Sequence, residues 1–268
     1  MFDIDGTLAM MDKETGTYTA LPGAAQALAD CRAAGIVPVA YTNGTFFPPA
    51  HYYPLLADAG LVLEPGHILT PAAVAARALA DRGYARIMVM GAEGTTVPVQ
   101  EAGIEVIAPR KGAPRVDAVL LGWTRDFNAE QLEAVVQAVW DGATPYAGSV
   151  APYFAGAGGK RLLGFSGAIA AALTNATGVE VTVFGKPQTA GLGIVSALTG
   201  AAPEEMMVIG DDPKLEIRMG RKAGSFCIGV TTGIADEATF NSYPGDERAH
   251  VVIPSLEGFA RNPWFQGA

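Results

Sequence analysis

Short apolar runs alternate with helix-like segments along this 268-residue chain, and this alternation constrains the fold more than any other feature. The apolar runs are rich in β-branched residues and include Ile36–Asn43, Arg86–Gly91, Val181–Lys186 and Met206–Asp212. Helix patterns lie between them, for example Asn128–Gly142, which begins at a capping asparagine and ends at a glycine. Continuous apolar strands are typical of parallel sheets covered on both faces, so the pattern predicts an α/β protein.

Composition narrows the range of functions. The net charge of -9 argues against a nucleic-acid surface, which is normally basic, and the basic stretch Pro109–Arg115 is interpreted as a solvated turn. The chain has no apolar run long enough to span a bilayer and no basic-then-apolar signal peptide. Its two cysteines and three histidines show no disulfide or zinc spacing. We therefore expect a cytoplasmic protein that binds neither nucleic acid nor membrane.

Polar side chains stand at the ends of four predicted strands. They are Asp3, Asp5, Thr42, Asn43, Lys186, Asp211 and Asp212. In open parallel sheets, ligands bind beyond the carboxyl ends of the strands, so these side chains are expected to meet there. Neighbouring acids repel one another unless a cation lies between them, and hard oxygen ligands suit Mg²⁺. A lysine and a threonine hydroxyl beside such a metal would make a pocket for a phosphoryl group.

These residues and their order resemble the haloacid dehalogenase (HAD) superfamily of phosphotransferases. The matching motifs are D-x-D-G-T at Asp3–Thr7, the threonine Thr42, the lysine Lys186, and Gly210–Asp212 with Glu216. The resemblance implies a Rossmann-like, doubly wound parallel sheet and a Mg²⁺ cofactor. It also implies that Asp3 is a nucleophile that forms an aspartyl phosphate, and that Asp5 is the general acid and base.

The resemblance assigns further roles. Asp3, the Asp5 carbonyl and Asp211 would ligate Mg²⁺, while Asp212 and Glu216 would hold the waters of the metal. The phosphoryl group would be bound by Thr42, Asn43, Gly44 and Lys186, of which the lysine also neutralises developing charge. Dehalogenases of the superfamily lack the acid that corresponds to Asp5, so its presence favours phosphate-ester hydrolysis or phosphate transfer.

About 140 residues separate Thr42 from Lys186, which is too many for a loop, so we expect an inserted domain. The predicted core comprises residues 1–82 and 183–268, and the predicted α/β cap comprises residues 83–182. The insertion resembles the class IIA cap of the 4-nitrophenylphosphatase, phosphoglycolate phosphatase and pyridoxal phosphatase branch. The segments that carry this resemblance are VLLGWTRDFNAEQLEAV, FGKPQ and GDDPKLEIRMGRKAG. It also implies a homodimer formed through the cap.

Substrate recognition is predicted for the segment Tyr146–Gly167, through Tyr146, Tyr153, Lys160 and Arg161; the alternative is an ordinary cap loop packed on a helix. The leading hypothesis is Mg²⁺-dependent hydrolysis of a phosphate monoester of a small metabolite. Two alternatives stay open: a phosphotransferase or phosphomutase, and a catalytically weak HAD protein that binds or regulates. Sugar phosphates, nucleotides, phosphoglycolate and pyridoxal phosphate all fit the sequence.

Overall fold

A computed structural model describes residues 1–12, 14–155 and 161–266 of the chain. These residues form two compact units, each built from separate stretches of sequence. The core unit comprises Met1–Thr42, His51–Leu69 and Lys186–Ala268, and the cap unit comprises Asn43–Ala50 and Thr70–Gly185. The predicted ranges, 1–82 with 183–268 and 83–182, stay a prediction about domains. The compact units place α3 (Pro71–Asp81) in the cap unit, because it packs against α4 (Glu93–Glu101).

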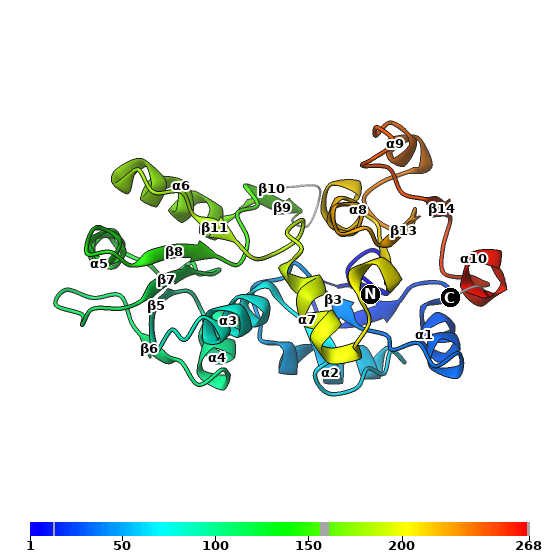
Figure 1. Ribbon diagram of the computed structural model, residues 1–268, viewed down its shortest axis with the longest axis horizontal. Coiled ribbons are helices and arrows are strands. Elements are labelled where there is room, and N and C mark those ends of the chain that lie inside the picture. The colour runs from blue at the N-terminus through cyan, green and yellow to red at the C-terminus, as the bar shows by residue number, and fades with distance from the viewer. Residues whose placement is uncertain (13, 156–160, 267–268) are drawn as a thin grey trace. The chain divides into compact units, whose positions relative to one another are not determined.

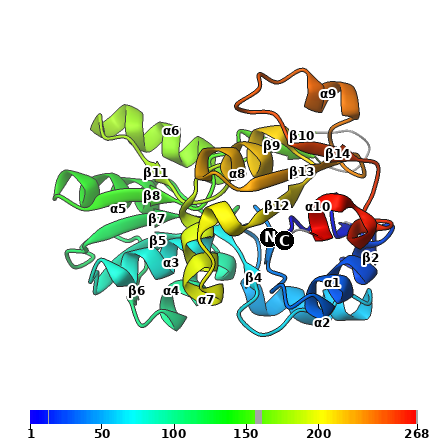
Figure 2. The ribbon, with the colours of Figure 1, turned by 45° about the vertical axis from the view of Figure 1, so that its right-hand side comes forward.

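The core unit contains a parallel sheet whose central strand is the very start of the chain. Its named strands are β3 (Ala40–Tyr41), β4 (Ile68–Leu69), β12 (Met207–Gly210), β13 (Phe226–Val230) and β14 (Val251–Ile253). Phe2 forms parallel bridges to Ala40 on one side and to Ile209 on the other. The resulting order is β4, β3, the first residues, β12, β13 and β14, and Figure 2 shows the last three side by side.

Three residues are enough to fix this central strand, because both neighbouring strands bind it. The Phe2 amide donates to the Val39 carbonyl at 2.8 Å, and the Asp3 amide donates to the Ile209 carbonyl at 2.9 Å. The Phe2 ring is buried, and its centroid lies 5.8 Å from that of Phe259. Asp3 therefore leaves the sheet at its carboxyl edge, as the strand-end pattern predicts.

Helices and one hairpin complete the core unit. The hairpin joins β1 (Ala9–Met11) to β2 (Tyr18–Ala20). The helical elements are α1 (Ala24–Ala33), α2 (Pro49–Asp58), α7 (Ala190–Thr199), α8 (Arg218–Ala223), α9 (Glu237–Asn241), α10 (Pro263–Gln266), the 3-10 turns Pro203–Glu205 and Phe259–Arg261, and the π-helix η3 (Pro213–Ile217). None of the described helices has the length and apolar character needed to cross a membrane.

The cap unit has its own parallel sheet, in the order β11, β8, β7, β5, β6. Its strands are β5 (Arg86–Met90), β6 (Glu105–Ile107), β7 (Ala118–Leu121), β8 (Thr144–Ala147) and β11 (Thr182–Val183), and a separate hairpin joins β9 (Tyr153–Ala155) to β10 (Arg161–Leu163). Helices α5 (Ala129–Trp140) and α6 (Phe165–Thr177) lie on one side of the strands, and α3 and α4 on the other (Figure 1). The predicted α/β class is confirmed.

The core of the cap unit is built from every second side chain along its strands. Met88 and Met90 on β5, like alternate residues of β7, pack in one buried cluster with Val135 of α5 and Ile169 of α6. The start of α5 is fixed by Asn128, whose side chain accepts from the Gln131 amide at 3.0 Å. The connection from β6 to β7 crosses β5 through residues 108–117, which contain no helix.

Candidate active site

Three buried acids and one buried lysine meet at the carboxyl edge of the core sheet. Asp3, Asp211 and Glu216 each offer a carboxylate oxygen, and these atoms lie within 4.8 Å of one another. The Lys186 Nζ lies 2.5 Å from Asp3 Oδ1 and 2.5 Å from Glu216 Oε1. Sequence positions 3, 186, 211 and 216 thus form one cluster, which we call the acid–lysine cluster.

Local structure explains how each acid reaches this cluster. Asp3 and Asp211 directly follow neighbouring strands of a parallel sheet, so both lie at the same edge. Glu216 comes from the π-helix η3, a rare element that is frequent at functional sites. Gly210 is needed beside it, because a Cβ there would lie 2.8 Å from Glu216 Oε2. Larger residues at position 210 would therefore displace the glutamate.

The ammonium group of Lys186 is held by backbone and by a ring as well as by carboxylates. It donates to the Tyr41 carbonyl at 2.7 Å, and its Nζ lies 5.4 Å from the centroid of the Tyr41 ring. The ring is fully buried, and Gly191 on α7 makes room for it: a Cβ on that glycine would lie 2.5 Å from Tyr41 Cε1. Sequence reasoning missed both residues, because nothing local links them to Lys186.

Burial dominates the electrostatics of the acids. Burial raises the pKa of Asp3 to about 7, against the lowering effect of Lys186 and with further raising by Asp211. Burial likewise raises the pKa of Glu216 to about 7, again against Lys186. Burial, followed by the nearby Glu216, raises the pKa of Asp211 to about 6. All three carboxyl groups therefore hold their protons more tightly than in water.

Lys186 compensates only part of the negative charge that the three acids carry when they are ionised. Burial by itself lowers the pKa of its ammonium group, but Asp3 and Glu216 outweigh that effect and leave the pKa above its ordinary value. Three carboxylates and one ammonium group leave a net charge of -2 when all are ionised, the charge that one divalent cation balances. Carboxylate oxygens are the ligands that Mg²⁺ prefers, so the donor set fits the metal.

Glycines and one threonine hold the turn after Asp5 against Asp211. Gly6 has a φ of 91°, which favours glycine, and a Cβ there would lie 2.8 Å from Asp211 Cγ. The Thr232 hydroxyl donates to the Gly6 carbonyl at 2.6 Å. The second oxygen of Asp211, Oδ2, accepts from the Ile234 amide at 2.8 Å. Thr232 also escaped sequence reasoning, because it lies in the turn after β13.

Asp5 differs from Asp3 in being exposed to solvent. Its charge helps to raise the pKa of the Tyr18 and Tyr52 phenols, an effect second to their burial. The two tyrosine rings lie 6.5 Å apart between centroids, one on β2 and the other on α2. An acid that solvent reaches can exchange its proton with water, as a general acid and base must.

The remaining predicted residues of the phosphoryl and metal sites are Thr42, Asn43, Gly44 and Asp212. Thr42 is buried directly after β3, and its amide donates to the Leu69 carbonyl at 3.2 Å. Asn43 and Gly44 belong to the cap unit. Asp212 lies outside the acid–lysine cluster, and its Oδ1 accepts from the Lys214 amide at 2.7 Å to cap η3. The roles assigned to these residues stay predictions.

The predicted substrate residues of the cap are only partly described. Tyr146 is buried in β8, where its hydroxyl accepts from Arg82 Nη1 at 2.8 Å and its ring lies 5.4 Å from that of Phe184. These contacts give it a packing role within the cap unit. Tyr153 is 48% exposed. Lys160 lies outside the described residues, as does the side chain of Arg161. Substrate contacts by these four residues stay a prediction.

The sequence of this chain is similar to those of known hydrolases and phosphatases. Residues 1–105 match the family model of haloacid dehalogenase-like hydrolases, and residues 183–259 match a model of HAD-like hydrolases. The dihydroxyacetone phosphatase of Corynebacterium glutamicum is 28% identical over 254 residues, which are 92% of this chain and 88% of the relative. The acid sugar phosphatase of Staphylococcus aureus is 25% identical, over 88% of this chain and 86% of the relative.

A solved structure of a phosphatase also resembles the structure of this chain. The glycerol phosphate phosphatase of Mycobacterium tuberculosis, in complex with magnesium, superimposes with a TM-score of 0.82. It is 26% identical, and the match covers 96% of this chain and 74% of that chain.

Proposed function

Because the chain belongs to the haloacid dehalogenase-like hydrolases, in the branch with a class IIA cap, we propose that this phosphatase hydrolyses phosphate monoesters of small metabolites through an aspartyl phosphate on Asp3. The observation that carries the proposal is the acid–lysine cluster, in which Lys186 touches Asp3 at 2.5 Å. A carboxylate held in place beside a fixed cation is suited to attack a phosphoryl group.

The reaction takes place in two displacements. In the first, an Asp3 carboxylate oxygen attacks phosphorus, the bond from phosphorus to the ester oxygen breaks, and Asp5 gives its proton to the leaving alcohol. In the second, water attacks the aspartyl phosphate, Asp5 takes a proton from that water, and the bond from phosphorus to Asp3 breaks. Lys186 orients Asp3 and offsets charge on the phosphoryl oxygens, while Thr42, Asn43 and Gly44 bind those oxygens.

The proposed cofactor is Mg²⁺, held by Asp3, the Asp5 carbonyl and Asp211, with Glu216 and Asp212 on its waters. The bound metal would supply Lewis-acid polarisation of the phosphoryl oxygens. Support comes from the fit of the donor set and from the magnesium complex of the mycobacterial enzyme. The relatives are phosphatases of dihydroxyacetone phosphate, sugar phosphates and glycerol phosphate, so polyol and sugar phosphates are the first substrates to test. Cytoplasmic location and a cap-mediated homodimer stay predictions.

The test is a panel of phosphate esters, among them glycerol phosphate, dihydroxyacetone phosphate, sugar phosphates and 4-nitrophenyl phosphate, assayed with Mg²⁺ and with EDTA. We expect metal-dependent release of phosphate, and a loss of about 10⁴-fold or more in kcat in Asp3→Asn. The control is Asp58→Asn, because Asp58 is an exposed acid on α2. Hydrolysis retained in Asp3→Asn would reject the nucleophile, and labelled phosphate passing to alcohols rather than water would favour a phosphotransferase.

A further inference from the structure

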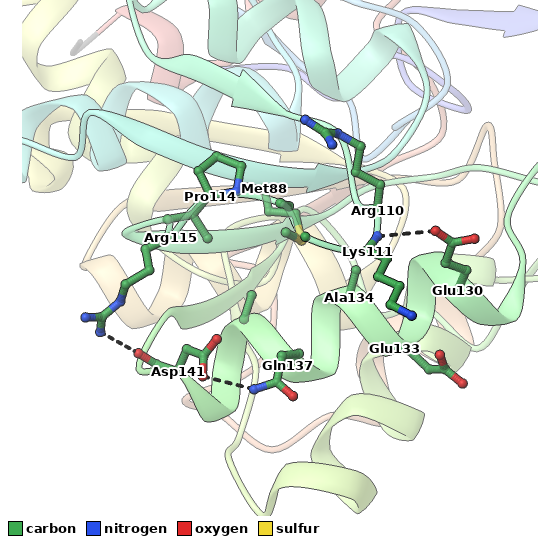
Figure 3. A pocket seen from close by; sticks show the side chains of 14 residues that line it. Met88, Arg110, Lys111, Pro114, Arg115, Glu130, Glu133, Ala134, Gln137 and Asp141 are labelled. Atoms are coloured by element: carbon green, nitrogen blue, oxygen red, sulfur yellow. Dashed lines mark hydrogen bonds between the residues drawn. The ribbon is translucent and has the colours of Figure 1, made fainter.

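A cavity of about 400 Å³ lies within the cap unit, between the crossover segment 108–117, strand β5 and helix α5 (Figure 3). Its apolar lining consists of Met88, Ala113, Pro114, Val116, Ala134 and Ala138. The first of these, Met88, is buried on β5 and belongs to the core of the cap unit. The size falls in the range of small-molecule sites, about 300–1,000 Å³.

The cavity follows from the topology of the sheet. Strands β6 and β7 flank β5, so the chain must cross β5 to connect them. Parallel strands are usually connected by a helix, which covers the sheet with side chains. Here the crossover is a loop with a turn at Gly112, whose φ is 71°. Because a loop fills less space than a helix, a hollow remains between it and α5. The half-buried Ala113, Val116, Ala134 and Ala138 form its floor, and they cover Met88, which is 2% exposed.

The two walls of the cavity carry opposite charges. The loop wall bears Arg110, Lys111 and Arg115, and the α5 wall bears Glu130, Glu133 and Asp141. Two hydrogen bonds between the walls each use one backbone atom: the Lys111 amide donates to Glu130 Oε1 at 3.3 Å, and Arg115 Nη2 donates to the Asp141 carbonyl at 2.8 Å (Figure 3).

In the described part of the chain, the charged side-chain groups of one wall form no ion pair with those of the other. The Asp141 carboxylate instead accepts from Gln137 Nε2 at 2.9 Å. In Figure 3, the Lys111 side chain extends toward the α5 wall that carries Glu133. A cation and an acid thus flank an apolar floor without neutralising each other.

We infer that this cavity binds a small zwitterion with an apolar body, of the aliphatic α-amino acid class. Its carboxylate would face Lys111, its ammonium group would face Glu133, and its side chain would lie over Ala113 and Ala134. A ligand with a single charge would be attracted by one wall and repelled by the other, whereas a zwitterion can place each of its charges beside the wall of opposite sign. This inference stands independently of the phosphatase reaction, because it uses residues of the cap unit only.

The test is an NMR titration of the full ¹⁵N-labelled chain with L-leucine. Two matched probes, 4-methylpentanoate and 3-methylbutylamine, each keep the apolar body and one charge. We expect saturable shifts at the amides of Met88, Lys111 and Gln137, and binding of L-leucine about tenfold or more tighter than either probe. Lys111→Gln and Glu133→Gln should each weaken binding by a similar factor, whereas Lys222→Gln, an exposed lysine of α8, should not.

Three outcomes would overturn the inference. They are the absence of saturable shifts with L-leucine, equal binding of 4-methylpentanoate, and unchanged binding in both wall variants. Far-UV circular dichroism of each variant ensures that a loss of binding is not a loss of fold. Binding measured in this way does not depend on any phosphatase activity.

Discussion

The core unit and the cap unit both gather lysine and acidic side chains, but in opposite environments. In the core, Lys186 is buried and lies 2.5 Å from both Asp3 and Glu216. In the cap cavity, Lys111 and Glu133 are exposed and form no ion pair among the described contacts. Buried charges must be paired, whereas water can solvate exposed ones separately. The comparison teaches that burial, rather than residue type, decides whether such groups act as a fixed cluster.

The largest expected effect comes from removing the buried lysine. Lys186→Met should lower the free energy of unfolding by about 3–5 kcal/mol, because Asp3 and Glu216 would lose their cation inside the protein. The matched Lys111→Met replaces an exposed lysine, and its effect should stay within about 0.5 kcal/mol. Urea unfolding followed by circular dichroism measures both. Equal losses in the two variants would break the comparison.

The next largest expected effect is stabilisation of the fold by Mg²⁺, which should depend on the acid–lysine cluster and not on the cap cavity. At a free concentration of about 100 times Kd, Mg²⁺ should add about 2.7 kcal/mol to the free energy of unfolding, because it binds only the folded chain. Asp211→Asn should lose most of this gain, since Asp211 belongs to the acid–lysine cluster. Glu133→Gln should keep it. Stabilisation by Mg²⁺ that survives in Asp211→Asn would count against a metal at the cluster.

Two glycines of α7 test whether the packing of the Tyr41 ring, which lies beside Lys186, matters for stability and catalysis. Gly191→Ala should lower the free energy of unfolding by about 1–3 kcal/mol and reduce kcat, because the added methyl group would press on the Tyr41 ring. Gly193→Ala on the same helix meets nothing within 4 Å and should stabilise the protein by about 0.5–1 kcal/mol. Thermal unfolding and phosphatase assays compare the pair. A reduced kcat in both variants would show that α7, not the Tyr41 ring, is responsible.

The smallest effect concerns an exposed acid of the cap whose pKa moves the other way. The Arg86 and Ala85 amides, each donating at 2.8 Å, hold the pKa of Asp117 below its ordinary value. A lowered pKa in the folded state means that its contribution is present above the unfolded pKa of about 3.9 and is lost as pH falls below it. Because solvent screens the exposed carboxylate, Asp117→Asn should cost only about 0.5 kcal/mol at pH 7 and less at pH 3. Urea unfolding at both pH values measures this, and a cost independent of pH would contradict it.

Sequence reasoning was most successful where chemistry follows directly from strand order. Asp3 and Asp211 end neighbouring strands, and parallel strands bring their carboxyl ends to one edge, so a cluster could be predicted without a structure. It failed to identify Tyr41 and Thr232 as neighbours of that cluster. The Tyr41 carbonyl lies 145 positions from Lys186 in sequence, and no local pattern connects the two.

In the cap unit, too, the sequence predicted local secondary structure but not tertiary contacts. The helix predicted over Asn128–Gly142 is confirmed as α5, because a capping residue and a glycine stop are local signals. The predicted substrate contact of Tyr146 stays a prediction, and the sequence did not show that its hydroxyl accepts from Arg82. Strand residues alternate between two faces, and the sequence alone does not tell which face another segment covers.

By itself, the sequence determined the α/β class, the order of its elements, and that Asp3 and Asp211 stand at strand ends. Only the tertiary structure decided which charges meet and which stay apart: Lys186 reaches Asp3 across 183 positions, while the Lys111 ammonium group forms no ion pair in the described part of the chain. The physical reason is that secondary structure follows from neighbours along the chain, whereas burial and pairing depend on segments brought together by folding.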